Sequence, residues 1–260
     1  MLCTPEELEA LSRDSSYHDL GTLPSLGIPY NNRELKFYIR TFRLPELKML
    51  SKAVELNEME HLLRAVDNVI SFPVKTLTIG DFFYVLLWLR LYSMPKSPYV
   101  IEWHCNQPFF VHKETRKYLT YQDENWPTVE QLRAEYENSP CDTENTSIVH
   151  QADVEILALD ENLVLPVGFD FPRMSIYQDR AAALKDPEMA MLAPAIQWFA
   201  GDTWEQKLAY AEANPDAVGE ALDLNRKVVH GIAEQVKFEC RRCRMEHVTK
   251  LELNALNFFR

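Results

Sequence analysis

The sequence predicts an α+β protein with a mainly helical body, one buried central helix and a small zinc-ribbon-like β element. Three observations lead to this fold class. The segment FFYVLLWLRLY is apolar on every face for about three helical turns, so it belongs inside a core. Two extended segments, one in the middle of the chain and one near its end, each run into cysteine. Apolar residues at three- and four-residue spacings fill much of the remaining chain, as in amphipathic helices.

Residues 1–33 are expected to form an N-terminal arm. A short helix over PEELEALSR (5–13) is followed by LGTLPSLGIPY (20–30), whose two prolines and two glycines predict an irregular path. We select four residues of this second segment as candidates for contacts with another protein: Leu23, Pro24, Ser25 and Tyr30.

Residues 34–139 are expected to form the core, with the central helix and the first cysteine strand. ELKFYIRTF (34–42) alternates apolar and polar residues and predicts a strand. One or two amphipathic helices are expected over 45–70, where apolar residues recur at helical spacing. A hairpin or arm is expected over 109–127, and a surface helix capped by its first threonine over 128–139.

The central helix is predicted over about 81–93, with Gly80-Asp81 as its N-cap. Arg90 is the one charge inside the apolar segment, so it needs a carboxylate or a set of carbonyls at the rim of the core. Asp81 and Arg90 are therefore assigned structural roles. The strand YVIEWHC (99–105) follows and ends at Cys105.

Residues 140–234 are predicted to form a mostly helical insertion. The polar segment SPCDTENTS (139–147) is the best candidate for a linker, and one or two short strands are expected over 154–169. The last part of the chain, 235–260, is expected to form a second knuckle and a strand. We expect its strand over 235–243 to pair with the 99–105 strand and so complete the ribbon.

Composition excludes several classes of protein. The net charge of -12 argues against broad binding to nucleic acid or to anionic membranes, which depends on clustered lysine and arginine. Neither a phosphate-cradling glycine motif nor a catalytic motif is found, so we expect no enzyme. No apolar run is long enough for a membrane span, and the N-terminus is too acidic for a signal peptide, so we expect synthesis and folding in a cytosol.

Cys240-Arg-Arg-Cys243 is the sharpest chemical signal in the sequence. Five cysteines in a long chain without an export signal favour metal ligation or buried thiols over disulfides. A zinc ribbon needs two such cysteine pairs, but the position three residues after Cys105 is Pro108. One structural zinc could be held by three cysteines and a histidine. The predicted ligands are Cys105, Cys240, Cys243 and His104, with His112 or His247 as alternatives to His104.

Two other interpretations of this motif stay open. The knuckle could keep its shape through packing without an ion. A redox role is less consistent with the sequence, because redox CxxC motifs usually open a helix, whereas the residues after Cys243 continue as a strand.

Two further features suggest contacts between proteins. Arg241, Arg242 and Arg244 lie beside the knuckle, and in a chain of this charge they more often mark an ion-paired interface than a nucleic-acid site. Phe258 and Phe259 at the C-terminus are unusual, because chain ends tend to be polar. They are expected to complete the ribbon's core or to dock into a neighbouring subunit.

Four segments, in this order, resemble the baseplate hub subunit family of T4-like contractile-tailed phages. LPSLGIPY (23–30) resembles the family's N-terminal LPS-x-G-x-x-Y element, and ELKFYIRTFRLPELKMLSKA resembles the strand and helix opening that come next. LTIGDFFYVLLWLRLYS is similar to an Asp-led apolar helix ending L-R-x-x-S. YVIEWHC and VKFECRRC resemble paired knuckles, although a second cysteine is absent from the first.

The resemblance implies a non-enzymatic structural component of a contractile phage tail baseplate. Such a bacteriophage virion component is made in the host cytoplasm and works in tail assembly through protein–protein interaction. Its partners would be other tail and baseplate proteins, and its copies would follow the symmetry of the tail. The alternatives are a tail-assembly chaperone absent from the mature particle and a zinc-ribbon nucleic-acid-binding adaptor.

Overall fold

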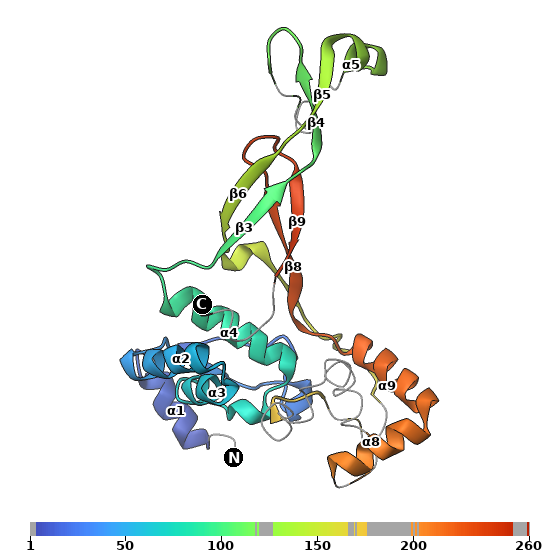
Figure 1. Ribbon diagram of the computed structural model, residues 1–260. Coiled ribbons are helices and arrows are strands. Elements are labelled where there is room, and N and C mark those ends of the chain that lie inside the picture. The colour runs from blue at the N-terminus through green and yellow to red at the C-terminus, as the bar shows by residue number, and fades with distance from the viewer. Residues whose placement is uncertain are drawn as a thin grey trace. The chain divides into compact units, whose positions relative to one another are not determined.

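A computed structural model describes residues 4–117, 119, 127–165, 169, 171–175, 199, 201, 203–251 and 259 (Figure 1). The described residues divide into two units. The first unit takes them from 1–95, 156–232 and 253–260, and the second from 96–155 and 233–252. Each unit thus combines stretches far apart in sequence, whereas the predicted division followed consecutive segments.

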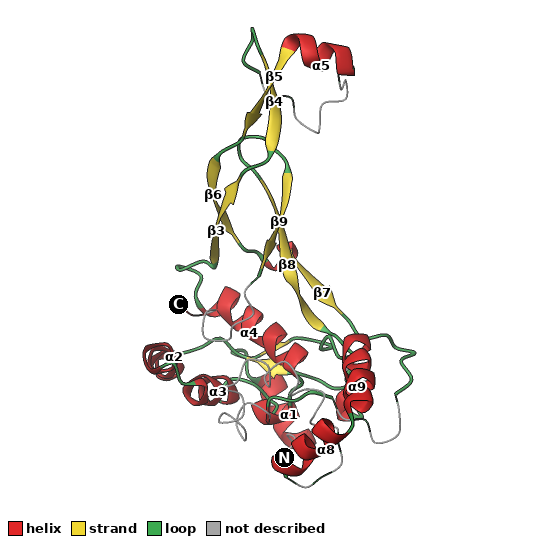
Figure 2. Ribbon diagram, turned by 45° about the vertical axis from the view of Figure 1, so that its right-hand side comes forward, coloured by secondary structure: helices red, strands yellow, loops and turns green. Residues whose placement is uncertain are grey.

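The elements of the first unit are mainly helical, as the red ribbons in Figure 2 show. They are α1 (Pro5–Arg13), β1 (His18–Asp19), η1 (Ile28–Tyr30), β2 (Tyr38–Ile39), α2 (Leu44–Leu56), α3 (Met59–Asp67), η2 (Val74–Thr76), α4 (Ile79–Ser93), α8 (Trp204–Ala213) and α9 (Pro215–Lys227). The amphipathic helices expected over 45–70 are α2 and α3. The strand expected over 34–42 is confined to β2, which pairs with β1.

Helix α4 lies inside the core of the first unit. Its residues from Val85 to Arg90 are all buried, together with Phe82. Phe82, Val85, Leu86, Trp88 and Leu89 belong to one core cluster with aliphatic residues of α2 and α3. This confirms the prediction made from its apolar faces. The predicted cap is wrong by two residues, because the hydroxyl of Thr78 accepts the backbone N–H of Asp81 and makes Thr78 the N-cap.

The carboxylate of Asp81 holds the LPSLGIPY segment against the start of α4. The side chain is 0 % exposed, and its Oδ1 accepts the backbone N–H of Ser25 at 3.1 Å. Its Oδ2 accepts the hydroxyl of Tyr30 at 2.6 Å, and that hydroxyl in turn accepts the backbone N–H of Thr78 at 3.0 Å. Burial, and then the charge of Asp81, raise the pKa of Tyr30 well above its ordinary value, so its hydroxyl stays a donor.

The start of β8 (Gly231–Glu239) packs against the same end of α4. The ring of His230 donates through Nδ1 to the carbonyl of Val228 at 2.7 Å, which leaves Nε2 to accept the hydroxyl of Thr78 at 2.6 Å. A Cβ added to Gly80 would lie 2.2 Å from the carbonyl oxygen of His230. Gly231 has φ +109, a conformation that a residue with a side chain rarely adopts.

The elements of the second unit are mainly strands. They are β3 (Val100–Cys105), β4 (Pro108–His112), α5 (Val129–Glu135), β5 (Tyr136–Pro140), β6 (Thr143–Ile148), η3 (Gln151–Asp153), β7 (Val154–Leu157), β8 and β9 (Glu246–Lys250), with the chain passing between units within β7 and early in β8. Thr128 caps α5 as predicted. The α+β class is confirmed in this coarse form: a mixed structure with small sheets and a cluster of four cysteines.

The strand pairing of the second unit differs from the predicted one. β3 pairs antiparallel with β6, from Val100↔Ile148 to Cys105↔Thr143, and β8 pairs with β9. The strands over 99–105 and 235–243 were expected to pair with each other, but each takes a partner nearer in sequence. The supposed linker over 139–147 holds the end of β5 and most of β6, so it is largely strand.

We call residues 106–140, between β3 and β6, the arm; of these, 106–117, 119 and 127–140 are described. β4 and β5 pair antiparallel from Pro108↔Pro140 to His112↔Tyr136, beyond the β3–β6 pair (Figure 2). An arm was expected over 109–127, but β4 pairs with β5, which lies outside that range. The surface helix expected over 128–139 ends at Glu135, and its last residues belong to β5. Of the expected insertion over 140–234, the described residues form β6 and β7 first and α8 and α9 later, while 176–198 lie outside the described residues. In the part of the chain described, no helix is long and apolar enough to cross a membrane.

We expect Asp81→Ala to lower the free energy of unfolding by about 2–4 kcal/mol, because two buried donors, Ser25 N–H and Tyr30 O–H, lose their acceptor. Chemical denaturation followed by far-UV circular dichroism measures this. Asp216→Ala is the control, since Asp216 is an exposed aspartate in the first turn of α9. Equal losses in the two variants would contradict the role given to Asp81.

We expect Gly80→Ala to destabilise the protein by about 1–3 kcal/mol, because the new Cβ forces the backbone at His230 away from α4. Gly219→Ala in α9 provides a matched control, since a Cβ there meets nothing within 4 Å. It should stabilise by about 0.5–1 kcal/mol through helix propensity. Thermal unfolding of both variants would show shifts of opposite sign, and shifts of the same sign would refute the close contact.

Candidate metal centre

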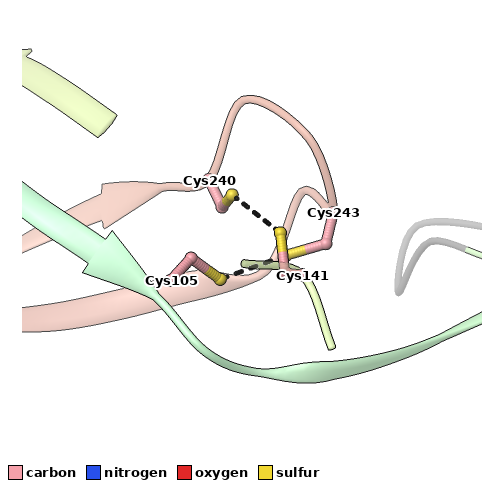
Figure 3. A group of neighbouring side chains, drawn as sticks. All are labelled: Cys105, Cys141, Cys240 and Cys243. Carbon is pink, nitrogen blue, oxygen red and sulfur yellow. Dashed lines mark hydrogen bonds between the residues drawn. The ribbon is translucent and has the colours of Figure 1, made fainter. Parts of the chain in front are cut away.

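Four cysteines converge in the second unit, and we call them the four-cysteine cluster: Cys105, Cys141, Cys240 and Cys243 (Figure 3). Cys105 ends β3, Cys141 lies between β5 and β6, and the other two lie in the turn between β8 and β9. Cys105, Cys141 and Cys240 are 0 % exposed and Cys243 is 1 % exposed. Cys3, the fifth cysteine of the sequence, lies outside the described residues.

The spacing of the thiols fits one tetrahedral ion. All four sulfur atoms lie within 4.8 Å of one another. Cys105 Sγ is 3.7 Å from Cys243 Sγ, and Cys141 Sγ is 3.6 Å from Cys240 Sγ. Metal–sulfur bonds of about 2.3 Å in a tetrahedron place sulfur atoms about 3.8 Å apart, whereas a disulfide needs about 2.05 Å. The cluster could therefore bind a metal ion such as zinc.

The turn between β8 and β9 is a knuckle that directs backbone N–H groups at its thiols. Cys240 accepts N–H groups from Arg242 and Cys243, and Cys243 accepts that of Met245. Cys105 likewise accepts the backbone N–H of Gln107, two residues on. The chain thus starts a similar turn after Cys105.

In the turn between β8 and β9, Cys240 is followed closely by a second cysteine, Cys243. After Cys105 no such cysteine follows, and Cys141 lies in the corresponding place. Its backbone N–H donates to the carbonyl of Gln107 at 2.9 Å, so it returns directly beside the turn that Cys105 begins. Residues 106–140 form the arm between these two cysteines. The first knuckle is therefore split: its two cysteines are both present, and the arm is inserted between them.

Hydrogen bonds and burial give the thiols of the cluster different pKa values. Burial acts to raise the pKa of Cys240, but the N–H groups of Cys243 and Arg242, with side-chain bonds from Cys141 and Asn145, outweigh it and lower this pKa to about 6. Burial raises the pKa of Cys105 and also that of Cys243. Cys240 thus becomes a thiolate before Cys105 and Cys243, and a metal ion would displace the protons of those two.

Cys105, Cys240 and Cys243 lie together as predicted, but the fourth position belongs to Cys141 and not to His104. The His104 ring is partly exposed, and its Nε2 lies 3.0 Å from Asp142 Oδ1. His112 lies in the arm, where its Nδ1 accepts two backbone N–H groups of the following turn. His247, the other alternative, contacts the cluster through Cys105: its Nε2 is 3.0 Å from Sγ.

Cys141 was missed because it lies in a polar segment interpreted as a linker. Two signals could have identified it. A thiol suits a site that already has three thiols, and Cys141 was the remaining cysteine far from the N-terminus. No local spacing relates Cys141 to Cys105.

The residues selected for partner contacts lie inside the first unit. Leu23, Pro24 and Ser25 are buried, and the half-buried Tyr30 is bonded to Asp81. Ser25 and Tyr30 hold this segment to α4, Leu23 packs in the core, and Leu23, Pro24 and Ser25 are too buried to form an exposed contact surface. Arg90, in contrast, is buried in α4 where a structural role was expected.

Phe259 also packs in the first unit and not in the ribbon, with its ring 5.7 Å from that of Phe42. Phe258 lies outside the described residues. Beside the knuckle, Arg242 donates to the carbonyl of Cys141 at 2.7 Å, and Arg244 pairs with Glu239 at 3.1 Å.

Together the fold and the cluster define an α+β protein with a candidate tetracysteine metal centre. Comparison with known proteins does not assign the chain to a family, because no family model, curated protein or solved structure matches it.

We expect Cys141→Ser to abolish stoichiometric metal binding, because an ion held by the three remaining thiols loses one of its four ligands. Elemental analysis of the purified protein should give one zinc per chain for the wild type and much less for this variant. His104→Ala should keep the full metal content. The reverse result would restore His104 as the fourth ligand.

Proposed function

We propose that this protein is a non-enzymatic structural component of a contractile phage tail baseplate, with one structural zinc in a zinc-ribbon-like element. The observation that carries the proposal is the closed set of four buried thiols. Catalytic zinc sites keep one position open for water or substrate, whereas four cysteines leave none. A site of this kind holds a fold together, which suits a protein that works through its surfaces.

The proposal that the protein acts in a baseplate rests on the order of the four segments that resemble the baseplate hub subunit family. The structure gives one of them a physical role, because LPSLGIPY is held to the Asp-led apolar helix by Asp81. The two segments thus form one structural unit in this chain. Their joint presence supports the resemblance more than either short motif does alone.

The nucleic-acid adaptor is less consistent with the contacts at the knuckle. Arg242 donates to the carbonyl of Cys141, and Arg244 pairs with Glu239. Phosphate binding would have to compete with both contacts, in a chain of net charge -12. The side chains of Arg242 and Arg244 therefore bond to residues at the knuckle itself.

Quantitative mass spectrometry of contractile tails, purified from the phage that encodes this chain, tests the proposal. We expect a fixed ratio of this protein to the other tail proteins in wild-type particles. A phage carrying Cys141→Ser should incorporate much less of it, because the second unit loses its metal. A phage carrying His104→Ala is the matched control and should incorporate the normal amount.

Two results would overturn the proposal. A protein that is required for tail formation but absent from finished tails would be an assembly chaperone. Binding to DNA or RNA that weakens steeply with added salt, with no incorporation into tails, would make it a nucleic-acid adaptor.

A further inference from the structure

His247 lies on β9 beside the four-cysteine cluster, and the ligand set does not use it. Its Nε2 is 3.0 Å from Cys105 Sγ. Its ring lies 4.7 Å from the ring of Trp103, whose indole N–H donates to Ser147 on β6 at 3.0 Å. The imidazole is half-buried, and from β9 it contacts two residues of β3, Cys105 and Trp103.

The complete set of four thiols, together with the distance to Cys105, favours a hydrogen bond over metal ligation for His247. A nitrogen at about 2.0 Å and a sulfur at about 2.3 Å from one tetrahedral ion would be about 3.5 Å apart. The observed 3.0 Å is shorter and fits a hydrogen bond between Nε2 and the sulfur. Since the four thiols already complete a tetrahedron, His247 is placed to contact a ligand and not the ion.

A buried tetrathiolate site needs such donors. Four thiolates around a divalent ion leave two negative charges, within a protein that already carries -12. Cys240 receives two backbone N–H groups and the side-chain amide of Asn145 at 3.6 Å. Cys105 receives one backbone N–H, from Gln107, so the ring of His247 is its second donor.

We propose that His247 is a positioning residue of the metal centre, whose Nε2–H donates to the Cys105 thiolate and keeps that ligand on the metal. The inference rests on the proposed metal centre and adds a residue to it. The neutral imidazole carries one N–H, so the donation requires no change of charge. Partners of metal ligands commonly change metal affinity by about 10–100-fold.

The test compares His247→Phe with His247→Gln. Phenylalanine keeps a ring against Trp103 but has no donor, whereas glutamine keeps an N–H donor. His104→Phe is the control, because His104 is a histidine on β3 that bonds to Asp142 away from the thiols. Two measurements are made on each purified full-length chain: the rate of zinc transfer to a chromogenic chelator, and the absorption spectrum after cobalt replaces zinc.

We expect His247→Phe to release zinc about tenfold faster or more. His247→Gln should lie nearer the wild type, and His104→Phe should match it. Cobalt spectra of all the proteins should show the charge-transfer intensity of four thiolates. Circular dichroism of the zinc-loaded proteins separates faster release from unfolding. If His247→Phe fails to fold, His247→Leu, which also lacks a donor, takes its place and should likewise release zinc faster than His247→Gln.

Three results would overturn the inference. Wild-type release rates in His247→Phe would show that the hydrogen bond does not hold the ligand. A wild-type cobalt spectrum of three thiolates and one nitrogen, altered in His247→Phe, would make His247 a ligand. A wild-type chain that binds neither metal would reject the metal centre itself, which the elemental analysis identifies before any variant is compared.

Discussion

The four-cysteine cluster is the constraint on which the second unit depends. Much of this unit consists of two-stranded pairs, and an isolated two-stranded hairpin is at best marginally stable in water. Among the described residues, Val111 is the other buried member of the cluster at the thiols, with Trp103 and Met245 packed against it. Four sulfur atoms occupy a place where larger apolar side chains would otherwise form a core. One ion bound by all four would supply that missing stabilisation.

The first unit is stabilised in a different way. Its core is an extensive cluster of aliphatic and aromatic side chains around α4, and one buried carboxylate, Asp81, positions the start of that helix. Thr78 connects the two sides of this region, because it caps α4 and donates to His230 at the start of β8. The polar groups of Asp81, Thr78 and His230 are buried, so leaving any of them without a partner would be costly. Their hydrogen bonds therefore select one arrangement of these chain segments, which apolar packing alone would not do.

The sequence was informative where a feature depends on neighbouring residues. The apolar faces of α4, the helical spacing of α2 and α3, and the cap at Thr128 are local patterns, and the structure contains all of them. It was uninformative where partners are distant. Cys141 joins Cys105 across the arm, and Tyr30 reaches Asp81 from 51 residues away. Such pairs leave no periodic signal, so strand pairing and the fourth ligand could not be deduced from spacing.

The split knuckle gives the arm a mechanical connection that a simple hairpin lacks. Residues 106–140 begin after one proposed metal ligand and end before another, so an ion bound by the four thiols would anchor both ends of the arm. A force on the arm would therefore reach metal–thiolate bonds directly, without first having to be carried by the hydrogen bonds of the β3–β6 pair. Because the ligands lie outside the inserted segment, the arm can change in length or sequence while the metal geometry stays the same.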